Sequence, residues 1–594
     1  MRKVCLVVVV IYSFDVFSYA QKIDDVEKVM MLSGVDSPEE LDPSEVERIS
    51  DFLDHPLRIN MLPESKLISS GILTRYQVAS LVDYRIRHGN VMSYTELAAV
   101  DGFTPEKVSI LRDFISLECH DIYDGTQCVQ NDLAVKSACK FTEQNDYNYG
   151  LKYRLRTDAF SMSIAASKSN AADAWFPDAY SGALTYDFKR IRGRVVFGDF
   201  NARFGQGLAL WSGAFITSLN SPDAFMKKSS GISEAWSFTG SSALTGFAGS
   251  FSFKRLTLTV LSAFPGVKSI GSKHKDLRIK PSVNLSWSCM HGSLSMTHVA
   301  ELTGIRDGNF RIPVMRTASD AAFCIRGVNL FGEMAYDWVS TDVHALTGTD
   351  FRIGESGRMA ALLKYLPSKW DDTAAHHGAA MSISCGFGRM ITQNGSDGFG
   401  AARKRHTAAF SIDAIRYIES KDDAAPHSIQ VKLFADWRYL INEYLEFKVR
   451  FSERLRTWGY KYRTDLRSDI IYMNGPFDFT LRMNILQCVN TSFATYIEQG
   501  YKYGWLSAYL RQGIFFVDDW EDRIYIYERD APGSFNVPAM YGRGWFASFV
   551  LSAKITYAVR LYFRAAYTGY DFMSYEKRKP GKAELKLQLV LRYL

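Results

Sequence analysis

Apolar and polar side chains alternate along most of the chain after residue 151. The alternation is clear over residues 195–200, 251–260 and 429–434, and strongest at the C-terminus. There one face carries Leu585, Leu587, Leu589, Leu591 and Tyr593, and the other carries Lys586, Gln588 and Arg592. Strands that separate lipid from a watery interior need this period of two. The pattern predicts an antiparallel, porin-like β-barrel membrane protein of about 16 strands over residues 151–594.

The first part of the chain follows a helical period instead. Apolar residues recur at helical spacing within 23–30 and again within 46–52. Residues 60–117 then read as helix, turn and helix twice over, with Gly71 and Gly102 at the sharp reversals and Pro105 in a first helical turn. We expect a small all-α domain over residues 21–118, with a tandem helix-hairpin-helix over about 56–118, and a linker over 119–150.

The N-terminus has the form of a secretory signal. Arg2 and Lys3 precede an apolar stretch over residues 4–12, and Ser18-Tyr19-Ala20 is a small-residue cleavage site. Residues 1–20 are therefore predicted to be a signal peptide. No later apolar run reaches the roughly 18 residues that a helical span needs. We expect an outer-membrane barrel with its helical domain in the periplasm, and a large soluble all-β protein is the alternative.

Charge is divided unevenly between the two parts. Residues 21–118 carry 10 Lys and Arg against 18 Asp and Glu, whereas residues 119–594 carry 58 against 45. A basic barrel interior favours anionic solutes, nucleic acid strands or lipopolysaccharide, although exposed loops can carry the same charge.

Seven of the eight cysteines follow the signal segment. Cys119, Cys128 and Cys139 cluster after the helical domain, where an oxidising periplasm allows either one disulfide or free thiols. Their spacing fits no compact metal-ligand motif, so we expect neither a metal site nor a cofactor.

The helical repeat resembles the tandem helix-hairpin-helix unit of the competence DNA receptor family. The matching residues are Asn60, Leu67, Gly71-Ile72, Tyr84-Arg85, Gly89, Glu96-Leu97, Gly102-Phe103 and Pro105. In that family the Gly-apolar-Gly turn brings backbone N–H groups at a helix N-terminus close to a phosphate. The resemblance implies a DNA- or phosphate-binding site at Gly71, Ile72, Arg75, Gly102, Phe103 and Lys107.

Two departures weaken that implication. Leu73 and Thr104 stand where the second glycine of each turn belongs, and residues 56–118 contain seven basic and seven acidic side chains. Duplex affinity comes largely from neutralising phosphates, and this domain has no surplus of cations to do so. We therefore favour a solvated helix face that binds a protein partner, with DNA as a disfavoured alternative.

Two further stretches suggest a family for the whole chain. One contains Gly198-Asp199-Phe200 and Phe204-Gly205-Gln206-Gly207-Leu208, and the other runs from Arg523 to Trp545. Together with Leu330-Phe331-Gly332-Glu333 they resemble a large Bacteroidetes family of helix-hairpin-helix outer-membrane barrels, which brings no function with it.

These stretches also supply candidate lumen residues. Arg203, Gln206 and Trp211 surround two glycines, which indicates an inward-folded segment that is either a substrate-contacting constriction or a tight structural turn. Arg523, Glu528 and Arg529 indicate an ion-pair network that fixes a long loop or lines the lumen.

The chain lacks the sequence signatures of an enzyme. No hydrolase signature or phosphate-binding Gly loop occurs, and the 11 histidines are dispersed. The leading hypothesis is a non-enzymatic outer-membrane barrel with a periplasmic helix-hairpin-helix adaptor, acting in transport or envelope assembly. Its expected partners are outer-membrane lipid, lipopolysaccharide and a periplasmic protein. The alternative is a DNA-uptake component that receives DNA through the helical domain.

Overall fold

The fold was analysed in a computed structural model of the full chain. It describes residues 25–593 except 36, 119–128, 143–144, 158, 169–176, 189–191, 214–218, 237–242, 266–277, 290, 305–309, 355, 371–372, 393–401, 420–425 and 571–580. The predicted signal peptide, Cys119 and Cys128 lie outside the described residues.

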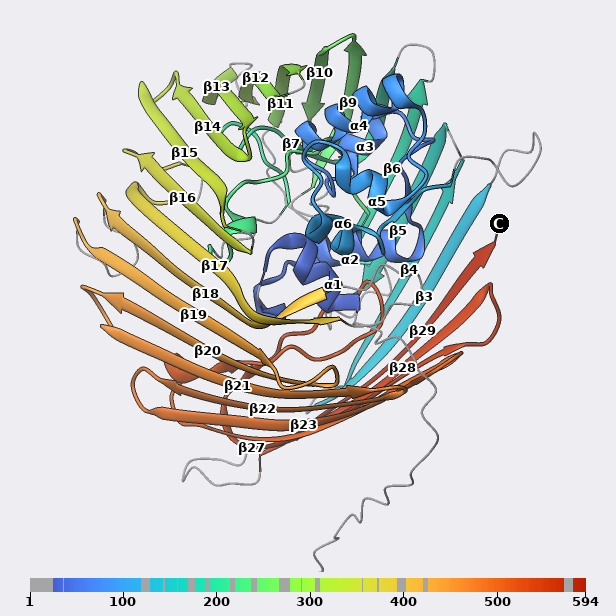
Figure 1. Ribbon diagram of the computed structural model, residues 1–594, viewed down its shortest axis with the longest axis vertical. Helices are drawn as coiled ribbons and strands as arrows, with labels where there is room; N and C mark the ends of the chain where they lie inside the picture. Colours follow the sequence, from blue (N-terminus) through green and yellow to red (C-terminus); the bar gives the residue numbers. More distant parts are fainter. Residues whose placement is uncertain are drawn as a thin grey trace, which may run out of the picture.

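The described strands close into one antiparallel barrel (Figure 1). The four-residue β8 pairs only at the end of β7, and β7 also pairs directly with β9, so the closed ring has 24 strands in the described part of the chain. The ring is sealed where β29 pairs with β3. Its strands are β3 (Gln130–Phe141), β4 (Asp146–Arg156), β5 (Phe160–Lys168), β6 (Ala179–Phe188), β7 (Gly193–Arg203), β8 (Gly231–Glu234), β9 (Leu244–Phe253), β10 (Leu256–Ala263), β11 (Arg278–Cys289), β12 (Gly292–Gly304), β13 (Phe310–Ile325), β14 (Val328–Asp337), β15 (Asp342–Ile353), β16 (Gly357–Leu366), β17 (His376–Thr392), β18 (Ala402–Tyr417), β19 (Ile429–Leu440), β20 (Leu445–Arg456), β21 (Tyr462–Asn474), β22 (Phe477–Gln487), β23 (Thr491–Tyr503), β24 (Leu506–Val517), β27 (Gly542–Lys554), β28 (Val559–Gly569) and β29 (Lys582–Tyr593).

The predicted number of about 16 strands was wrong. On β13, the positions opposite the outward-facing Met296 and Leu294 are Ser319 and Ala321, and Thr349 of β15 lies opposite the outward-facing Leu330. Small or polar residues on the outer face remove the alternation by which strands were counted. The barrel also begins earlier than expected, because β3 and the start of β4 occupy much of the segment 119–150 that we predicted to be a linker.

The outer face of the barrel is apolar, as lipid requires. Exposed apolar side chains recur on strands around the ring, among them Leu151, Ile164, Phe197, Leu285, Ile485 and Leu587. A closed ring also leaves no unpaired strand edge in the hydrocarbon layer. The protein is therefore an outer-membrane barrel, as predicted.

The two ends of the barrel differ in the length of their connections. At the end where β3 begins and β29 ends, β9 joins β10 and β13 joins β14 through tight turns. The opposite end carries the long connections 204–230 and 518–541. Because outer-membrane barrels have short periplasmic turns and long extracellular loops, the first end faces the periplasm.

The N-terminal segment folds into a compact helical domain. It contains α1 (Asp25–Ser33), η1 (Pro38–Glu40), α2 (Pro43–Asp54), α3 (Glu64–Ser69), α4 (Arg75–His88), α5 (Tyr94–Ala99) and α6 (Pro105–Leu111), and a parallel pair joins β1 (Leu57–Arg58) to β2 (Ile115–Ser116). Asp42, Thr74, Ser93 and Thr104 cap four of the helices.

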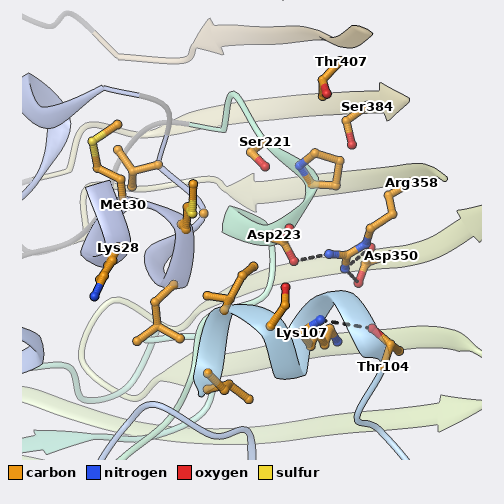
Figure 2. A pocket seen from close by; sticks show the side chains of 18 of the residues that line it. Lys28, Met30, Thr104, Lys107, Ser221, Asp223, Asp350, Arg358, Ser384 and Thr407 are labelled. Carbon is orange, nitrogen blue, oxygen red and sulfur yellow. Dashed lines mark hydrogen bonds and ion pairs between the residues drawn. The ribbon is translucent and has the colours of Figure 1, made fainter. Parts of the chain in front are cut away.

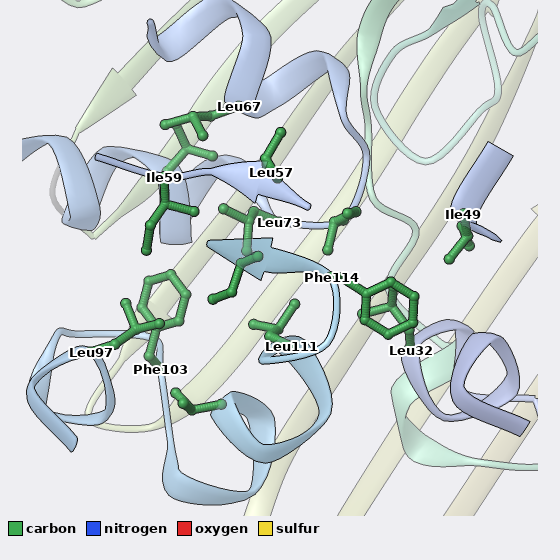
Figure 3. Packing of buried hydrophobic residues seen from close by; sticks show 14 of the residues in the cluster. Leu32, Ile49, Leu57, Ile59, Leu67, Leu73, Leu97, Phe103, Leu111 and Phe114 are labelled. Atoms are coloured by element: carbon green, nitrogen blue, oxygen red, sulfur yellow. The ribbon is translucent and has the colours of Figure 1, made fainter. Parts of the chain in front are cut away.

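The domain has its own hydrophobic core (Figure 3). Leu67, Leu97 and Phe114 are fully buried at its centre. Asn60 joins the two hairpins, because its side chain donates to the carbonyls of Val91 and Leu117 at 2.9 and 2.8 Å. Phe535 is the one residue from the barrel part of the described chain that packs against this core. None of the described helices is long and apolar enough to cross a membrane.

The helical domain lies inside the ring of strands (Figure 1). We expected it on the periplasmic side of the barrel, and the structure places it in the lumen. Its ion pairs with Arg592, Arg560 and Asp187 lie near the periplasmic ends of β29, β28 and β6. The domain is thus seated in the lumen from the periplasmic half of the barrel.

Candidate functional site

One face of α2 carries an acidic stripe that meets a basic stretch of wall. Glu47, Asp51 and Asp54 follow each other at i, i+4 and i+7, so they lie on the same side of the helix. Glu47 pairs with Lys152. Asp51 lies 2.9 Å from Arg154 and 3.2 Å from Arg156. Asp54 lies 2.7 Å from Arg560 and 2.5 Å from Arg592.

Other acidic residues of the domain reach different strands. Glu39 lies 3.3 Å from Arg467 and 3.1 Å from Arg482, and it also accepts the backbone N–H of Tyr527. Glu45 pairs with Arg203 at 2.9 Å. Glu27 lies 3.6 Å from Lys448 of β20. The acidic domain therefore contacts the basic wall on several sides, which explains the opposite charges of the two parts of the chain.

These contacts set the ionisation of the domain's carboxyl groups. Burial alone raises the pKa of Glu39, but Arg467 and Arg482 outweigh it and lower the pKa to about 2. Burial likewise opposes ionisation of Asp51, whereas Arg156 and Arg154 hold its pKa well below the usual range. Glu39 and Asp51 are therefore charged at neutral pH.

The connection 204–230 folds back into the lumen on a single carboxylate. Glu333 of β14 accepts the backbone N–H groups of Gln206, Leu208 and Ala209 at 2.6, 3.1 and 3.1 Å. Gly205 has φ +57°, and a Cβ there would lie 2.7 Å from the same carboxylate. The tight turn and close approach of this segment therefore require glycine.

The predicted lumen residues near this turn lie within it or beside it. Gln206 is buried and accepts the backbone N–H of Lys227 at 2.9 Å. The guanidinium of Arg203 lies over Trp211 at 5.5 Å and also binds Glu45. This group therefore links the inward segment to the helical domain.

The connection 518–541 supplies the other predicted lumen residues, which the structure places apart. Glu528 is buried and pairs with Arg564 of β28. Arg529 lies 2.9 Å from Glu498 of β23. Arg523 is held locally, over Trp520 at 4.6 Å. The side chains of Glu528 and Arg529 thus fasten this connection to the inner wall, whereas Arg523 contacts the wall through its backbone carbonyl, which accepts from Arg463 of β21 at 3.2 Å.

Both hairpin turns of the helical domain are covered. Ile72 and Phe103 are buried in the domain core. A Cβ on Gly71 would lie 3.1 Å from the guanidinium of Arg48, and one on Gly102 would lie 2.7 Å from the ring of Tyr76. A side chain of the same domain therefore lies against the Cα of each glycine, while Ile72, Gly102 and Phe103 also border the large cavity of the lumen.

The two cations predicted beside these turns face the lumen. Arg75 donates to the hydroxyl of Ser229 at 3.1 Å. Lys107 lies beside the pair formed by Asp223 and Arg358, and Arg358 also binds Asp350 at 2.7 Å (Figure 2). Burial, reinforced by Arg358, lowers the pKa of Lys107.

A large cavity of about 1490 Å³ separates the helical domain from the wall. Of the described residues, 17 Lys and Arg and 11 Asp and Glu line it, so its surface is net basic. The lining includes Gly327, Met390, Met473 and Lys502 near periplasmic strand ends, and Arg511 deeper in the barrel. The space can accommodate water and anionic solutes on the periplasmic side.

Sequence reasoning missed the residues that seat the domain. Glu39, Glu47, Asp51 and Asp54 were counted only as part of an acidic excess. The spacing of Glu47, Asp51 and Asp54 along α2 was a usable signal, because three carboxylates on one helix face need cations or water opposite them. Their partners on β4, β28 and β29 could not be identified without the barrel closure.

Of the three clustered cysteines, Cys119, Cys128 and Cys139, the structure describes Cys139 alone. Cys139 lies on β3 and forms no disulfide within the described part of the chain. Among the described residues, no group of three or more His, Cys, Asp or Glu side chains is placed to hold a metal ion.

Comparisons with known proteins find similarity in structure alone. No family model and no curated protein matches the sequence. The chain is similar to the siderophore receptor PirA from Pseudomonas aeruginosa, with 8% identity, a TM-score of 0.40, and coverage of 80% of this chain and 82% of that one. It is also similar to the translocation pore of the P pilus usher PapC, with 7% identity, a TM-score of 0.37, and coverage of 78% and 99%. Likenesses at this level carry no functional argument.

Proposed function

We propose that the protein is an outer-membrane transport barrel in which the helical domain is a releasable plug. The main observation that supports this proposal is the set of ion pairs between the acidic domain and the basic inner wall. A barrel of this size encloses a lumen far wider than its side chains fill, since barrels of about 22 strands already need a plug. The lumen of this barrel holds the helical domain.

The character of the interface supports release rather than permanent packing. The apolar core of the domain lies almost wholly within the domain, and β1 and β2 join the two ends of the segment that contains α3 to α6. The contacts with the wall are mainly charged. Charged groups can exchange a partner for water at modest net cost, whereas separation of an apolar interface exposes its full area to water. The domain can therefore move as a folded unit.

We further propose that a periplasmic partner acts on the part of the domain that stays exposed. Ile86 and Met92 are 76% and 72% exposed, beside the exposed basic residues Arg87 and His88. This is the adaptor role suggested by the sequence. Cross-linking from Cys introduced at residue 86, followed by pull-down, should capture one periplasmic protein, and capture of none would remove the adaptor role.

Carbodiimide cross-linking tests the plug without altering the chain. The reagent joins a lysine amine directly to a neighbouring carboxylate. It should link Lys448 to Glu27 and Lys66 to Asp187, because these pairs lie 3.6 and 3.4 Å apart and bridge the domain to the wall. Ionic conductance across a planar bilayer should show transient openings before treatment and lose them afterwards.

An internal pair provides the control for this experiment. Lys28 and Asp113 lie 2.9 Å apart within the helical domain, so their link should form without fixing the domain to the wall. The triple variant Lys448→Gln, Lys66→Gln, Lys152→Gln lacks the three lysines that pair across the domain–wall boundary, keeps that internal link and should keep its openings after treatment. Openings that persist in the wild type, once peptide mapping confirms both domain–wall links, would rule out the plug.

A further inference from the structure

A second cavity lies in the wall, apart from the helical domain. It has a volume of about 390 Å³ and is bounded by β3, β4, β5, β27, β28, β29 and part of the inward connection within residues 531–536. Cavities of this size hold small molecules. None of its lining residues belongs to the helical domain.

The strand register explains the hollow and its charge. Ala138 of β3 lies opposite Lys586 of β29 on one side and Asn148 of β4 on the other. Lys136 and Lys140 point inward two positions to either side of Ala138, so both lie diagonally across from Lys586. The small side chain at position 138 leaves space among three lysines.

The charges around this hollow do not cancel. Five cations line it within the described chain, Lys136, Lys140, Lys168, Arg564 and Lys586, together with one carboxylate, Glu584. Asp530 and Glu528 lie at its margin, 2.6 Å from Lys586 and against Arg564 respectively. Two more cations than carboxylates are thus gathered in a site whose opposite wall is the inward connection.

The inward connection gives the site a fixed wall. The side-chain amide of Gln588 donates to the carbonyl of Pro532 at 2.8 Å, and Ser534 N–H donates to the carbonyl of Ala531 at 3.0 Å. Gly533 and Ser534 present small groups to the cavity. Lys140 and Lys168 lie toward the ends of their strands that carry the long connections, so the site lies in the extracellular half of the barrel.

We propose that this cavity binds a small polyvalent oxyanion, such as a phosphorylated or polycarboxylated solute, that enters from outside the cell. Lys136, Lys140 and Lys586 form the binding group, and Lys168 lies at its extracellular side. Charge-assisted hydrogen bonds to several cations favour an anion that carries more than one negative charge. The cations all belong to the wall strands, so they stay in place if the helical domain moves, although Phe535, which also lines the cavity, packs against the core of that domain.

Titration calorimetry of the full chain in detergent micelles tests the site, with pyrophosphate as the ligand and glucose as the neutral control. The double variant Lys136→Gln, Lys140→Gln should weaken pyrophosphate binding about tenfold or more. Ala138→Phe should do the same by filling the hollow while every charge stays in place. Lys432→Gln should have no effect, because this inward-facing lysine of β19 lines neither cavity.

The lysine variants and Ala138→Phe distinguish pyrophosphate binding in this cavity from binding in the larger basic cavity. Binding that survives both the lysine double variant and Ala138→Phe, or that falls equally in Lys432→Gln, would overturn the proposal, as would the absence of pyrophosphate binding at low ionic strength. Heat-dependent gel migration confirms that each barrel is folded. If the double variant does not fold, Ala138→Phe and the single variant Lys168→Gln carry the test.

Discussion

Arg592, on the last strand of the barrel, lies 2.5 Å from Asp54 at the end of α2, although 538 positions separate them in the sequence. Asp54 also binds Arg560 on the neighbouring strand at 2.7 Å. The strand that completes the ring therefore also holds the domain inside it.

Removal of two carboxylates from α2 should loosen the helical domain. The double variant Asp51→Asn, Asp54→Asn leaves Arg154, Arg156 and Arg592 with fewer partners in a partly buried site, and loss of one member of such a pair costs about 3–5 kcal/mol. The backbone amide hydrogens at the contacts between the domain and the wall should exchange markedly faster. Asp83→Asn is the control, since Asp83 pairs with the exposed Arg87, and an equal effect from it would contradict this interpretation.

Reversal of both charges in the Glu47–Lys152 pair should restore part of the attachment between the helical domain and the wall. Glu47→Lys places two cations together and should loosen the domain, and Lys152→Glu should do so by placing two carboxylates together. The double variant re-forms an ion pair of opposite orientation. A double-mutant cycle, measured as protection of the domain's amide hydrogens from exchange, should therefore show a favourable coupling free energy. Strict additivity of the two single effects would contradict the contact.

Acidification should release the domain only at low pH. The pKa of Glu39 falls from 4.5 to about 2 on folding, because its two arginines outweigh the opposing effect of burial. A lowered pKa stabilises the seated state above pH 4.5, and this stabilisation is lost as the pH falls toward 2. Amide hydrogen exchange of the untreated protein should show a seated domain at pH 7 and pH 5 and a looser one at pH 3. Release of the helical domain between pH 7 and pH 5 would contradict this prediction.

The sequence predicted the two-part architecture but not how the parts fit together. The C-terminal leucines and the Gly71 and Gly102 turns are local patterns, so strand alternation and helical hairpins could be recognised from them. The number of strands depended on positions such as Ser319 and Thr349, whose side chains carry no apolar signal. The seating of the domain depends on pairs such as Asp54 and Arg592, which only the closed ring brings together.

Glu333 should control the order of the inward connection. Glu333→Leu removes the acceptor for three backbone N–H groups, and each unsatisfied buried donor costs about 1–3 kcal/mol. Limited proteolysis should then cut within residues 204–211 faster than in the wild type. Glu419→Gln, at an exposed position near the end of β18, should leave the rate unchanged.

A charge on the lipid face should destabilise the barrel more than one on the lumen face. Leu587 points outward on β29 and is half exposed, and its neighbour Gln588 points inward. Leu587→Arg should cost about 2–4 kcal/mol if it lies near the midplane of the bilayer. The midpoint of heat-dependent gel migration in lipid vesicles should fall for Leu587→Arg more than for Gln588→Arg, and the reverse order would contradict the assignment of the two faces.

The seam between β3 and β29 has a consequence for biogenesis. The wall cannot become a ring until β29 has been synthesised and inserted, by which time the helices that precede β3 have long since left the ribosome. A domain with a complete core of its own need not thread through a finished pore, because the growing sheet can curl around it. Assembly of the barrel and loading of its contents are then one event, and the chain encloses its own N-terminal part.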